Sequence, residues 1–375
     1  TKLLKEILLE MKHEHTSKAK LVEFCQTKYA DSILQLGLID EFEQEYNYRL
    51  AIHWYTKQSF LYAMLNRSLR KQDIETIMKM GFFIHDLHQQ IVELYHEQSK
   101  TSSKNKFIVF RGQAATLDEL EKIQSNQGGL LSFNSFLSTS LDEKVAFRFA
   151  EEAYNNPNVI VFLFSMEIDP KISSVPFASV GSQSKYNDEQ EVLFSMHAVF
   201  RIMGVRNLQE RFWQVNLNLT SDDDEQLKNL ADYMRKELGQ GTPLDKLGHL
   251  MLRMGEFDQA QEIYAPQLDS TDEQNWRKHA HLNHQLGYVY NEKGDYKTAL
   301  SYYEKALKSE LTFRSSEDPM LASTYNNIAG VYESLGDYTS ALSSYQTALK
   351  IEKKSLAPDH PTLATTYSNI GLVHK

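Results

Sequence analysis

Three short segments carry side chains that could together hold a ligand with both phosphate and sugar groups. Arg111 ends an apolar run, residues 138–140 read Ser-Thr-Ser, and Glu189 and Glu191 lie two residues apart before another apolar run. Residues two apart on a strand face the same side, so both carboxylates can point into one cavity. An arginine, a hydroxyl cluster and paired carboxylates at three strand ends therefore indicate a site for such a ligand.

Each segment also has a simpler interpretation when it is taken alone. Arg111 would be a surface charge at a strand end, and residues 138–140 would cap a helix before Leu141. Glu189 and Glu191 would lie in a solvated turn. The occurrence of all three segments in this order favours a single site over three unrelated features.

Other kinds of chemistry have little support in the sequence. No GxGxxG follows a strand and no GxxxxGK[ST] occurs, which argues against a Rossmann fold and a Walker-type ATPase. No cysteine or HExxH pattern accompanies the grouped histidines, so we interpret them as helix surface positions and expect no metal. Cys25 has no histidine–acid frame, and we interpret it as a packing residue. The grouped histidines are His85 and His88, and His279, His281 and His284.

The elements that would position these residues change in type near residue 105. Up to that point the apolar spacing predicts helices. Strands are predicted at 107–110, 159–166, 192–200 and 212–219, with turn residues between them. Helices followed by strands predict an α+β domain with mixed or antiparallel sheets, not a doubly wound one.

The last third of the chain is repetitive. Eight positions carry the same residue again 42 residues later, as Gly294 and Gly336 do. The recurring positions are Gly294, Asp295, Tyr296, Ala299, Leu300, Tyr303, Ala306 and Leu307. An earlier copy contains Gly255, Phe257, Ala260 and Tyr264, and a fourth copy stops with the chain inside its first helix.

Each copy is predicted to be a pair of amphipathic helices. Small residues such as Gly287 and Ala329 would let the helices approach closely, with tyrosine or phenylalanine filling the gaps. Gly-Asp or Gly-Glu steps supply the turns, and Asp318-Pro319 and His360-Pro361 mark helix starts. The pattern resembles the tetratricopeptide repeat, whose usual period is about 34 residues. The longer spacing is similar to the repeats of kinesin light chains.

The two parts are predicted to meet near residue 220. Ser221 followed by acidic residues is typical of a helix start, with Ser221 as the N-cap. We therefore expect one domain over 1–220, with helices to about 105 and a sheet core over about 106–220. The repeat domain would cover 221–375, its last repeat truncated.

The order R…STS…ExE resembles the Arg-Ser-Glu class of mono-ADP-ribosyltransferases, which includes vertebrate ecto-enzymes and clostridial binary toxins. AIHWYTKQSFLYAMLNRSLR and GGLLSFNSFLSTSLDEKVAFRFA are similar to that family's helical lead-in and middle segment. The resemblance covers roughly residues 45–220. It implies an ADP-ribosyltransferase fold, with a helical N-terminal part and two packed β-sheets around an NAD cleft. FRGQ places arginine at the first motif, which disfavours the His-Tyr-Glu class of polymer-forming transferases.

The resemblance implies NAD or NADP as co-substrate and arginine on a protein as acceptor, the reaction of a glycosyltransferase. Arg111 would bind a phosphate or ribose oxygen. Gly112 and Gln113 would lie beside the nicotinamide, where the missing side chain of the glycine exposes backbone groups to the carboxamide. Phe149 would stack on the nicotinamide, although core packing is an equal alternative.

The second and third motifs would carry the chemistry. Ser138 would hold ribose or position the carboxylate, with Thr139 and Ser140 fixing that strand. Glu191 would bond the ribose 2′-hydroxyl and stabilise the oxocarbenium-like cation as nicotinamide leaves.

Acceptor specificity would lie just before the catalytic acid. Glu189 would hold the acceptor guanidinium and help it to lose a proton, since ExE goes with arginine modification in the family. Tyr186 would stack on the acceptor, unless it is a loop tyrosine without contacts.

Two other functions stay open. The chain could be an NAD glycohydrolase whose acceptor is water, or an inactive transferase fold that serves as a platform for the repeats. The repeats would present a groove to a peptide or protein partner.

Composition limits the setting of the protein. The 375 residues carry a net charge of −10, one cysteine and no apolar run long enough for a transmembrane helix. We therefore expect a cytoplasmic protein without an internal disulfide and without nucleic-acid or membrane partners.

Overall fold

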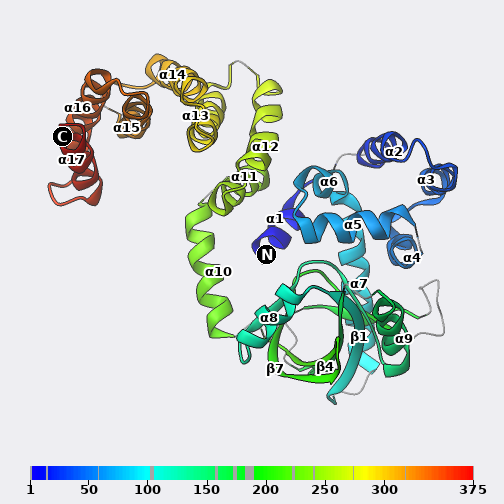
Figure 1. Cartoon of the computed structure of the whole chain (residues 1–375). Coiled ribbons are helices and arrows are strands. Elements are labelled where there is room, and N and C mark those ends of the chain that lie inside the picture. Colours follow the sequence, from blue (N-terminus) through cyan, green and yellow to red (C-terminus); the bar gives the residue numbers. More distant parts are fainter. Residues whose placement is uncertain are drawn as a thin grey trace. The chain divides into compact units, whose positions relative to one another are not determined.

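The computed structural model describes all residues except 1, 14–15, 58, 102–104, 157–158, 172–174, 182–189, 222–223, 240, 273, 317 and 375. The chain divides into two compact units, Thr1–Gly239 and Gln240–Lys375 (Figure 1). Each unit has its own architecture, the first mixing helices with a sheet and the second containing helices.

The first unit begins with a helical layer, as predicted for the residues before 105. The apolar face of its longest helix repeats with helical spacing, because Phe83, Ile84, Leu87 and Ile91 are all fully buried. The elements are α1 (Lys2–Glu10), α2 (Ser17–Lys28), α3 (Ile33–Glu45), η1 (Tyr48–Leu50), α4 (Ala51–Thr56), α5 (Phe60–Lys71), α6 (Ile74–Lys79) and α7 (Gly81–Thr101). Cys25 of α2 is buried, in agreement with the packing interpretation.

An eight-stranded mixed sheet follows, in the order β2-β7-β8-β4-β1-β3-β6-β5. β4 and β8 are parallel, whereas the other described pairs are antiparallel. This confirms the predicted mixed sheet. The strands are β1 (Phe107–Ala115), β2 (Leu130–Phe133), β3 (Leu137–Ser140), β4 (Ile160–Ile168), β5 (Phe177–Ser179), β6 (Glu191–Phe194), β7 (Ala198–Gln209) and β8 (Phe212–Leu219).

One predicted strand is two strands in the structure. The run predicted at 192–200 is interrupted between β6 and β7 by Ser195, Met196 and His197. His197 is buried and has a φ of 63°, a left-handed conformation that a strand residue does not adopt. The uniform apolar character of the run hid this break.

The sheet consists of two groups of strands that share one core. A single register pair, Phe110 with Ser140, joins β1 to β3 and links the two groups into one sheet. Val109 and Phe164 from one group pack in the same buried cluster as Val192 and Phe194 from the other. The predicted two packed sheets therefore correspond to these two groups.

Two further helices lie on the strands, and one follows them. α9 (Glu143–Tyr154) packs on β1, and α8 (Leu117–Ser125) packs near β7 (Figure 1). α10 (Glu225–Leu238) belongs to the first unit, where Arg235 donates to both carboxylate oxygens of Glu6 at 2.7 and 3.2 Å.

The helix predicted after residue 221 exists, but its predicted N-cap is wrong. The helix begins at Glu225, so the residue before it is Asp224 and not Ser221. Ser221 instead accepts a turn hydrogen bond from the backbone N–H of Asp224 at 3.2 Å. The carboxylate of Asp224 is held by Arg201 at 2.5 Å, which fixes the helix start to the sheet.

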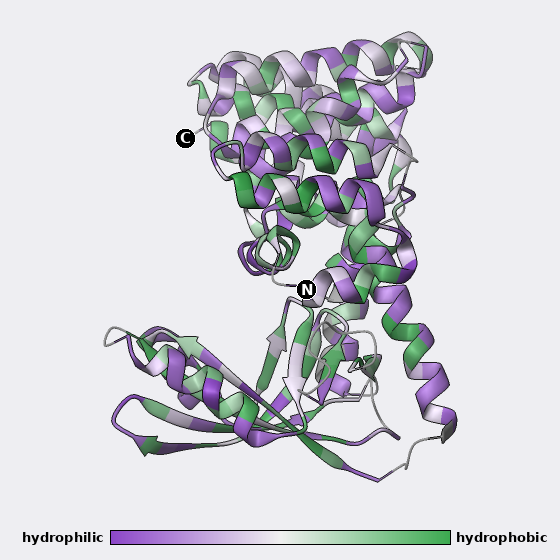
Figure 2. Ribbon diagram, turned by 90° about the vertical axis from the view of Figure 1, so that its right-hand side faces the viewer, coloured by the Kyte–Doolittle hydropathy of each residue, from purple (hydrophilic) through white to green (hydrophobic). Residues whose placement is uncertain are grey.

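The second unit is a series of consecutively packed helices, and Figure 2 shows hydrophobic and hydrophilic residues alternating around them. Its turns confirm the predicted Gly-Asp and Gly-Glu steps, since Gly255, Gly294 and Gly336 have left-handed φ values of 76°, 78° and 79°. The helices are α11 (Pro243–Met254), α12 (Phe257–Asp269), α13 (Trp276–Glu292), α14 (Tyr296–Phe313), α15 (Pro319–Ser334), α16 (Tyr338–Ser355) and α17 (Pro361–Val373).

Small residues and tyrosines pack against one another in this unit as the repeats predict. A Cβ atom on Gly248 would lie 2.3 Å from the ring of Tyr264, and one on Gly287 would lie 2.8 Å from the ring of Tyr303. Both tyrosines are buried. The glycines therefore let each tyrosine fill the space between paired helices.

Within the described residues, no helix combines the length and the apolar character needed to cross a membrane.

Candidate functional site

Arg111 connects the two groups of strands at the point where they diverge. It lies on β1 immediately after Phe110, the one residue of β1 that is in register with β3. Its Nη1 donates to the carbonyl of Ser138 at 2.8 Å, and its Nε donates to Oε1 of Gln113 at 3.2 Å. The guanidinium is therefore held in a defined orientation by one contact on its own strand and one on β3.

Ser138 and Glu191 form the centre of the candidate site. The hydroxyl of Ser138 donates to Oε1 of Glu191 at 2.6 Å, and Glu191 is only 6% exposed. In the antiparallel register Glu191 pairs with Ser140, which places Ser138, Ser140 and Glu191 on one face of β3 and β6. A short bond to an ionised acceptor is a strong one, so the carboxylate is oriented by the serine.

The other hydroxyls of the Ser-Thr-Ser segment hold the strand itself. Thr139 lies on the opposite face and donates to the carbonyl of Val192 at 2.8 Å. The hydroxyl of Ser140 accepts from the backbone N–H of Asp142 at 3.0 Å. The N-cap of α9 is Asp142, so the simpler interpretation of residues 138–140 as a helix cap is wrong.

The fold explains why residue 112 is a glycine, and the sequence did not reveal this explanation. A Cβ atom there would lie 2.2 Å from the carbonyl oxygen of Ala146 and 2.7 Å from the backbone nitrogen of Ala150, both on α9. The glycine therefore allows α9 to pack on β1. The sequence-based explanation, that the missing side chain exposes backbone to a ligand, is not needed to account for it.

We expect Gly112→Ala to destabilise the first unit by about 1–3 kcal/mol, because the added methyl group forces the backbone of α9 away from β1. Gly204→Ala is the matched control, since Gly204 is also a strand glycine and a Cβ there meets nothing within 4 Å. Urea unfolding of the full chain measures both free energies. Equal stability of the two variants would contradict the explanation.

The other candidate residues are Phe149, Glu189 and Tyr186. Phe149 lies on α9 and is 52% exposed, so the alternative of core packing is wrong and its ring is accessible. Glu189 and Tyr186 lie outside the described residues. The structure thus brings Arg111, Ser138 and Glu191 together.

Sequence reasoning missed a pair of side chains that support this centre. Tyr55 of α4 is fully buried, donates to the carbonyl of Phe136 at 3.1 Å and accepts from Nδ2 of Asn66 of α5 at 3.1 Å. Phe136 is two residues before Ser138, so the helical layer is tied to the strand that carries the serine. Burial raises the pKa of Tyr55, so the hydroxyl stays protonated and keeps donating. The sequence showed this tyrosine and this asparagine in the helical lead-in, but nothing in it indicated that they contact each other or the carbonyl of Phe136.

We expect Tyr55→Phe to lower several-fold the rate of any reaction that depends on the pair of Ser138 and Glu191. The substitution removes one buried hydrogen bond, worth about 0.5–1.5 kcal/mol, and so loosens the segment before Ser138. Tyr46→Phe is the matched control: Tyr46 is a buried tyrosine whose hydroxyl donates to Asp86 at 2.7 Å. Initial rates and thermal unfolding are measured for both. Rates that fall equally in the two variants would show that Tyr55 acts through stability alone.

The interpretation as a helix surface position is wrong for His88 of α7, which is partly buried. Nδ1 of His88 lies 2.7 Å from the hydroxyl of Ser195, and burial lowers the pKa of His88 to about 4. Among the described residues, no group of three His, Cys, Asp or Glu side chains is arranged to hold a metal ion.

Two family profiles match the chain. That of the NAD:arginine ADP-ribosyltransferases covers residues 8–225, and that of the tetratricopeptide repeat covers residues 239–309 and 320–375. The second match confirms the predicted repeats. The chain matches none of the curated proteins compared with it.

Several solved structures resemble parts of the chain. The ADP-ribosyltransferase Vis in complex with agmatine is 22% identical with a TM-score of 0.36, over 58% of this chain and 92% of that one. The ADP-ribosyltransferase HopU1 of Pseudomonas syringae pv. Tomato DC3000 is 17% identical with a TM-score of 0.36, over 56% and 99%. TPR-like repeats from Podosopora anserina, described as those of a kinesin light chain, are 17% identical with a TM-score of 0.32, over 34% and 63%.

Proposed function

Because the chain belongs to the NAD:arginine ADP-ribosyltransferase family, we propose that it transfers ADP-ribose from NAD to arginine side chains of protein targets. Family membership supports an ADP-ribosyltransferase that uses NAD, and the arginine acceptor is the finer part of the proposal. The observation that carries the proposed reaction on NAD is the hydrogen bond of 2.6 Å from Ser138 to the buried carboxylate of Glu191, next to Arg111.

In the proposed complex, Arg111 binds a phosphate or ribose oxygen of NAD. Its guanidinium is always charged and presents several donors in one plane, which suits a pyrophosphate. Gly112 and Gln113 lie beside the nicotinamide, and the accessible ring of Phe149 stacks on it. Holding the phosphate or ribose on one side and the nicotinamide on the other leaves the bond between nicotinamide and its ribose exposed to attack.

Glu191 acts on the sugar. Its carboxylate accepts a hydrogen bond from the ribose 2′-hydroxyl while the bond from C1′ to the nicotinamide nitrogen breaks and its electron pair leaves with nicotinamide. Positive charge develops at C1′, and a fixed negative charge nearby stabilises this transition state more than the ground state. Ser138 keeps the carboxylate in that position.

A guanidine nitrogen of the acceptor then forms the new bond to C1′. The guanidinium has a pKa above about 12, so it must lose a proton as it attacks. We assign Glu189 to hold the acceptor and take this proton, and Tyr186 to stack on the guanidinium. Both residues lie in the connection between β5 and β6, directly before Glu191.

We further propose that residues 1–220 act as the transferase domain and that residues 221–375 contain the repeats that recruit substrate or partner proteins, with α10 at their start packed in the first compact unit. Tetratricopeptide arrays present a concave surface that binds peptides. A cytoplasmic location is part of this proposal, since the lone Cys25 is buried and can form no disulfide within the chain.

The test is to treat a cell lysate with NAD and the full chain and to identify the modified residues by mass spectrometry. ADP-ribose on arginine supports the proposal, whereas exclusive modification of another residue type overturns it. Nicotinamide release is measured in parallel, with and without agmatine as a small arginine analogue. If agmatine does not change the release of nicotinamide and forms no adduct, an NAD glycohydrolase is favoured. If calorimetry detects no binding of NAD, an inactive platform is favoured.

A further inference from the structure

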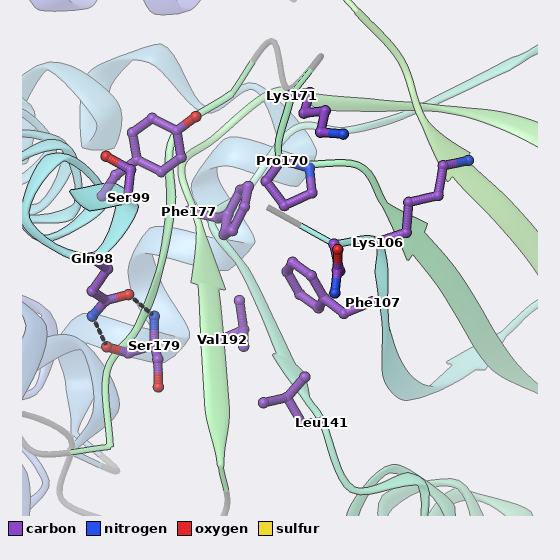
Figure 3. Close-up of a pocket in the computed structure, with 12 residues that line it drawn as sticks. Gln98, Ser99, Lys106, Phe107, Leu141, Pro170, Lys171, Phe177, Ser179 and Val192 are labelled. Carbon is purple, nitrogen blue, oxygen red and sulfur yellow. Dashed lines mark hydrogen bonds between the residues drawn. The ribbon is translucent and has the colours of Figure 1, made fainter. Parts of the chain in front are cut away.

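The first unit contains a pocket of about 770 Å³ whose described lining includes none of the residues assigned above to NAD or the acceptor. Ligand pockets of small molecules commonly have volumes of about 300–1,000 Å³. The lining residues come from the end of α7, the start of β1, the segments after β3 and β4, and strands β5 and β6 (Figure 3).

The pocket lies on the opposite face of the catalytic strand. Val192 lines it, and Val192 directly follows Glu191 on β6, so the two side chains point to opposite faces. Thr139, the register partner of Val192, shares its face, whereas Ser138 and Glu191 share the other. The pocket is therefore separate from the candidate site, although one strand serves both.

Aromatic rings form much of the wall. Phe177 lies at the centre, with ring centroids 5.3 Å from Tyr95 and 5.7 Å from Phe107. Figure 3 shows Pro170 close to both phenylalanines and Val192 and Leu141 on the adjoining wall. Such a wall favours a planar aromatic ligand, since offset and edge-on ring contacts stabilise beyond the area they bury.

The polar groups of the wall lie on two sides. On one side their hydrogen bonds are already formed within the protein, and on the other side the groups are positively charged. Gln98 donates to the carbonyl of Ser179 at 2.8 Å and accepts from its backbone N–H at 2.9 Å, so this part of the β5 edge is already bonded. Lys106 and Lys171 lie on the other side in Figure 3. Lys106 is paired with Glu167 at 2.7 Å, whereas Lys171 is exposed, and we assign the recognition of an anion to Lys171. None of the described lining residues is acidic.

We propose that this pocket binds a planar aromatic carboxylate at a site separate from the NAD site. The rings of Phe107 and Phe177 hold the aromatic part, and Lys171 attracts the carboxylate at the mouth. This inference concerns binding and does not depend on the acceptor that the enzyme uses.

The test is a titration of the full chain with 2-naphthoate, followed by calorimetry or by the fluorescence of the probe. We expect saturable binding that saturating NAD leaves unchanged. Ser99→Phe, which places a ring in the pocket from an exposed position on α7, is expected to weaken binding at least ten-fold. Lys171→Glu is expected to weaken it about five-fold, with less effect at high salt.

Two controls make the outcome decisive. Lys71→Glu reverses an exposed lysine at the end of α5, away from the residues that line the pocket, and should bind like the wild type. The neutral amide of 2-naphthoate should bind several-fold more weakly than the acid. Absence of saturable binding, full affinity in Ser99→Phe, equal affinity for the amide, or displacement by NAD would each overturn the proposal.

Discussion

Glu191→Gln is expected to remove nearly all activity: the rates of nicotinamide release and of ADP-ribose transfer should both fall about 10²–10³ below those of the wild type. The substitution replaces one oxygen by an NH₂ group and changes almost nothing in size, so the side chain can still lie beside Ser138. What it removes is the negative charge that faces the cation developing at C1′. Little water reaches this position, because Glu191 is only 6% exposed, so solvation does not compensate for the lost charge.

The measurement follows nicotinamide release and labelled ADP-ribose from the same NAD sample. Glu121→Gln serves as the matched control, because Glu121 is an exposed carboxylate on α8 that has no assigned role. Both variants should unfold at the wild-type temperature, which separates catalysis from folding. If Glu191→Gln kept full activity, the assignment of Glu191 as the catalytic carboxylate would fail.

The pairing of Ser138 with Glu191 shows how far sequence reasoning reaches for this site. The segments are 53 residues apart, yet three motifs in a known order were enough to predict that Arg111, the hydroxyl cluster and Glu191 share one site. The structure adds the contacts that no spacing contains. Arg111 reaches the backbone of Ser138 and not its hydroxyl, and the hydroxyl is taken by Glu191.

The elements that escaped prediction are those whose stability is not local. β2 and β5 contain four and three residues, and β2 is held by hydrogen bonds to β7, which lies far away in the sequence. A short run has too few positions to show an alternating pattern. The repeat helices were predicted in detail for the opposite reason, since each helix pair packs mainly on its neighbours in sequence.

Gly112 and Tyr55 illustrate a second limit. Each was visible in the sequence, and Gly112 was even assigned a role, but the partner that explains it lies on another element. For Gly112 the partner is the backbone of α9, and for Tyr55 it is the carbonyl of Phe136. Residue type and spacing identify side chains that can act, whereas the reason for a small or buried residue depends on what the fold places against it.

Glu189→Gln is expected to lower transfer to arginine by at least about 10² while NAD hydrolysis stays within a few-fold of the wild type. Cleavage of the nicotinamide bond requires the charge of Glu191, which this variant retains. Attack by the guanidinium additionally requires a base, because its pKa above about 12 leaves almost no neutral form at pH 7. Water needs far less help to trap the cation, so only the acceptor step should fail.

The measurement compares the agmatine adduct with total nicotinamide release in the same reaction. Asp188→Asn is the matched control, since it removes the adjacent carboxylate of the same connection and should leave the ratio of adduct to nicotinamide unchanged. A loss of both products in Glu189→Gln would assign this residue to NAD cleavage, and retention of both would remove it from acceptor specificity. A fall of the adduct alone, restricted to Glu189, would separate the two carboxylates by function: Glu191 breaks the bond to nicotinamide, and Glu189 decides what replaces it.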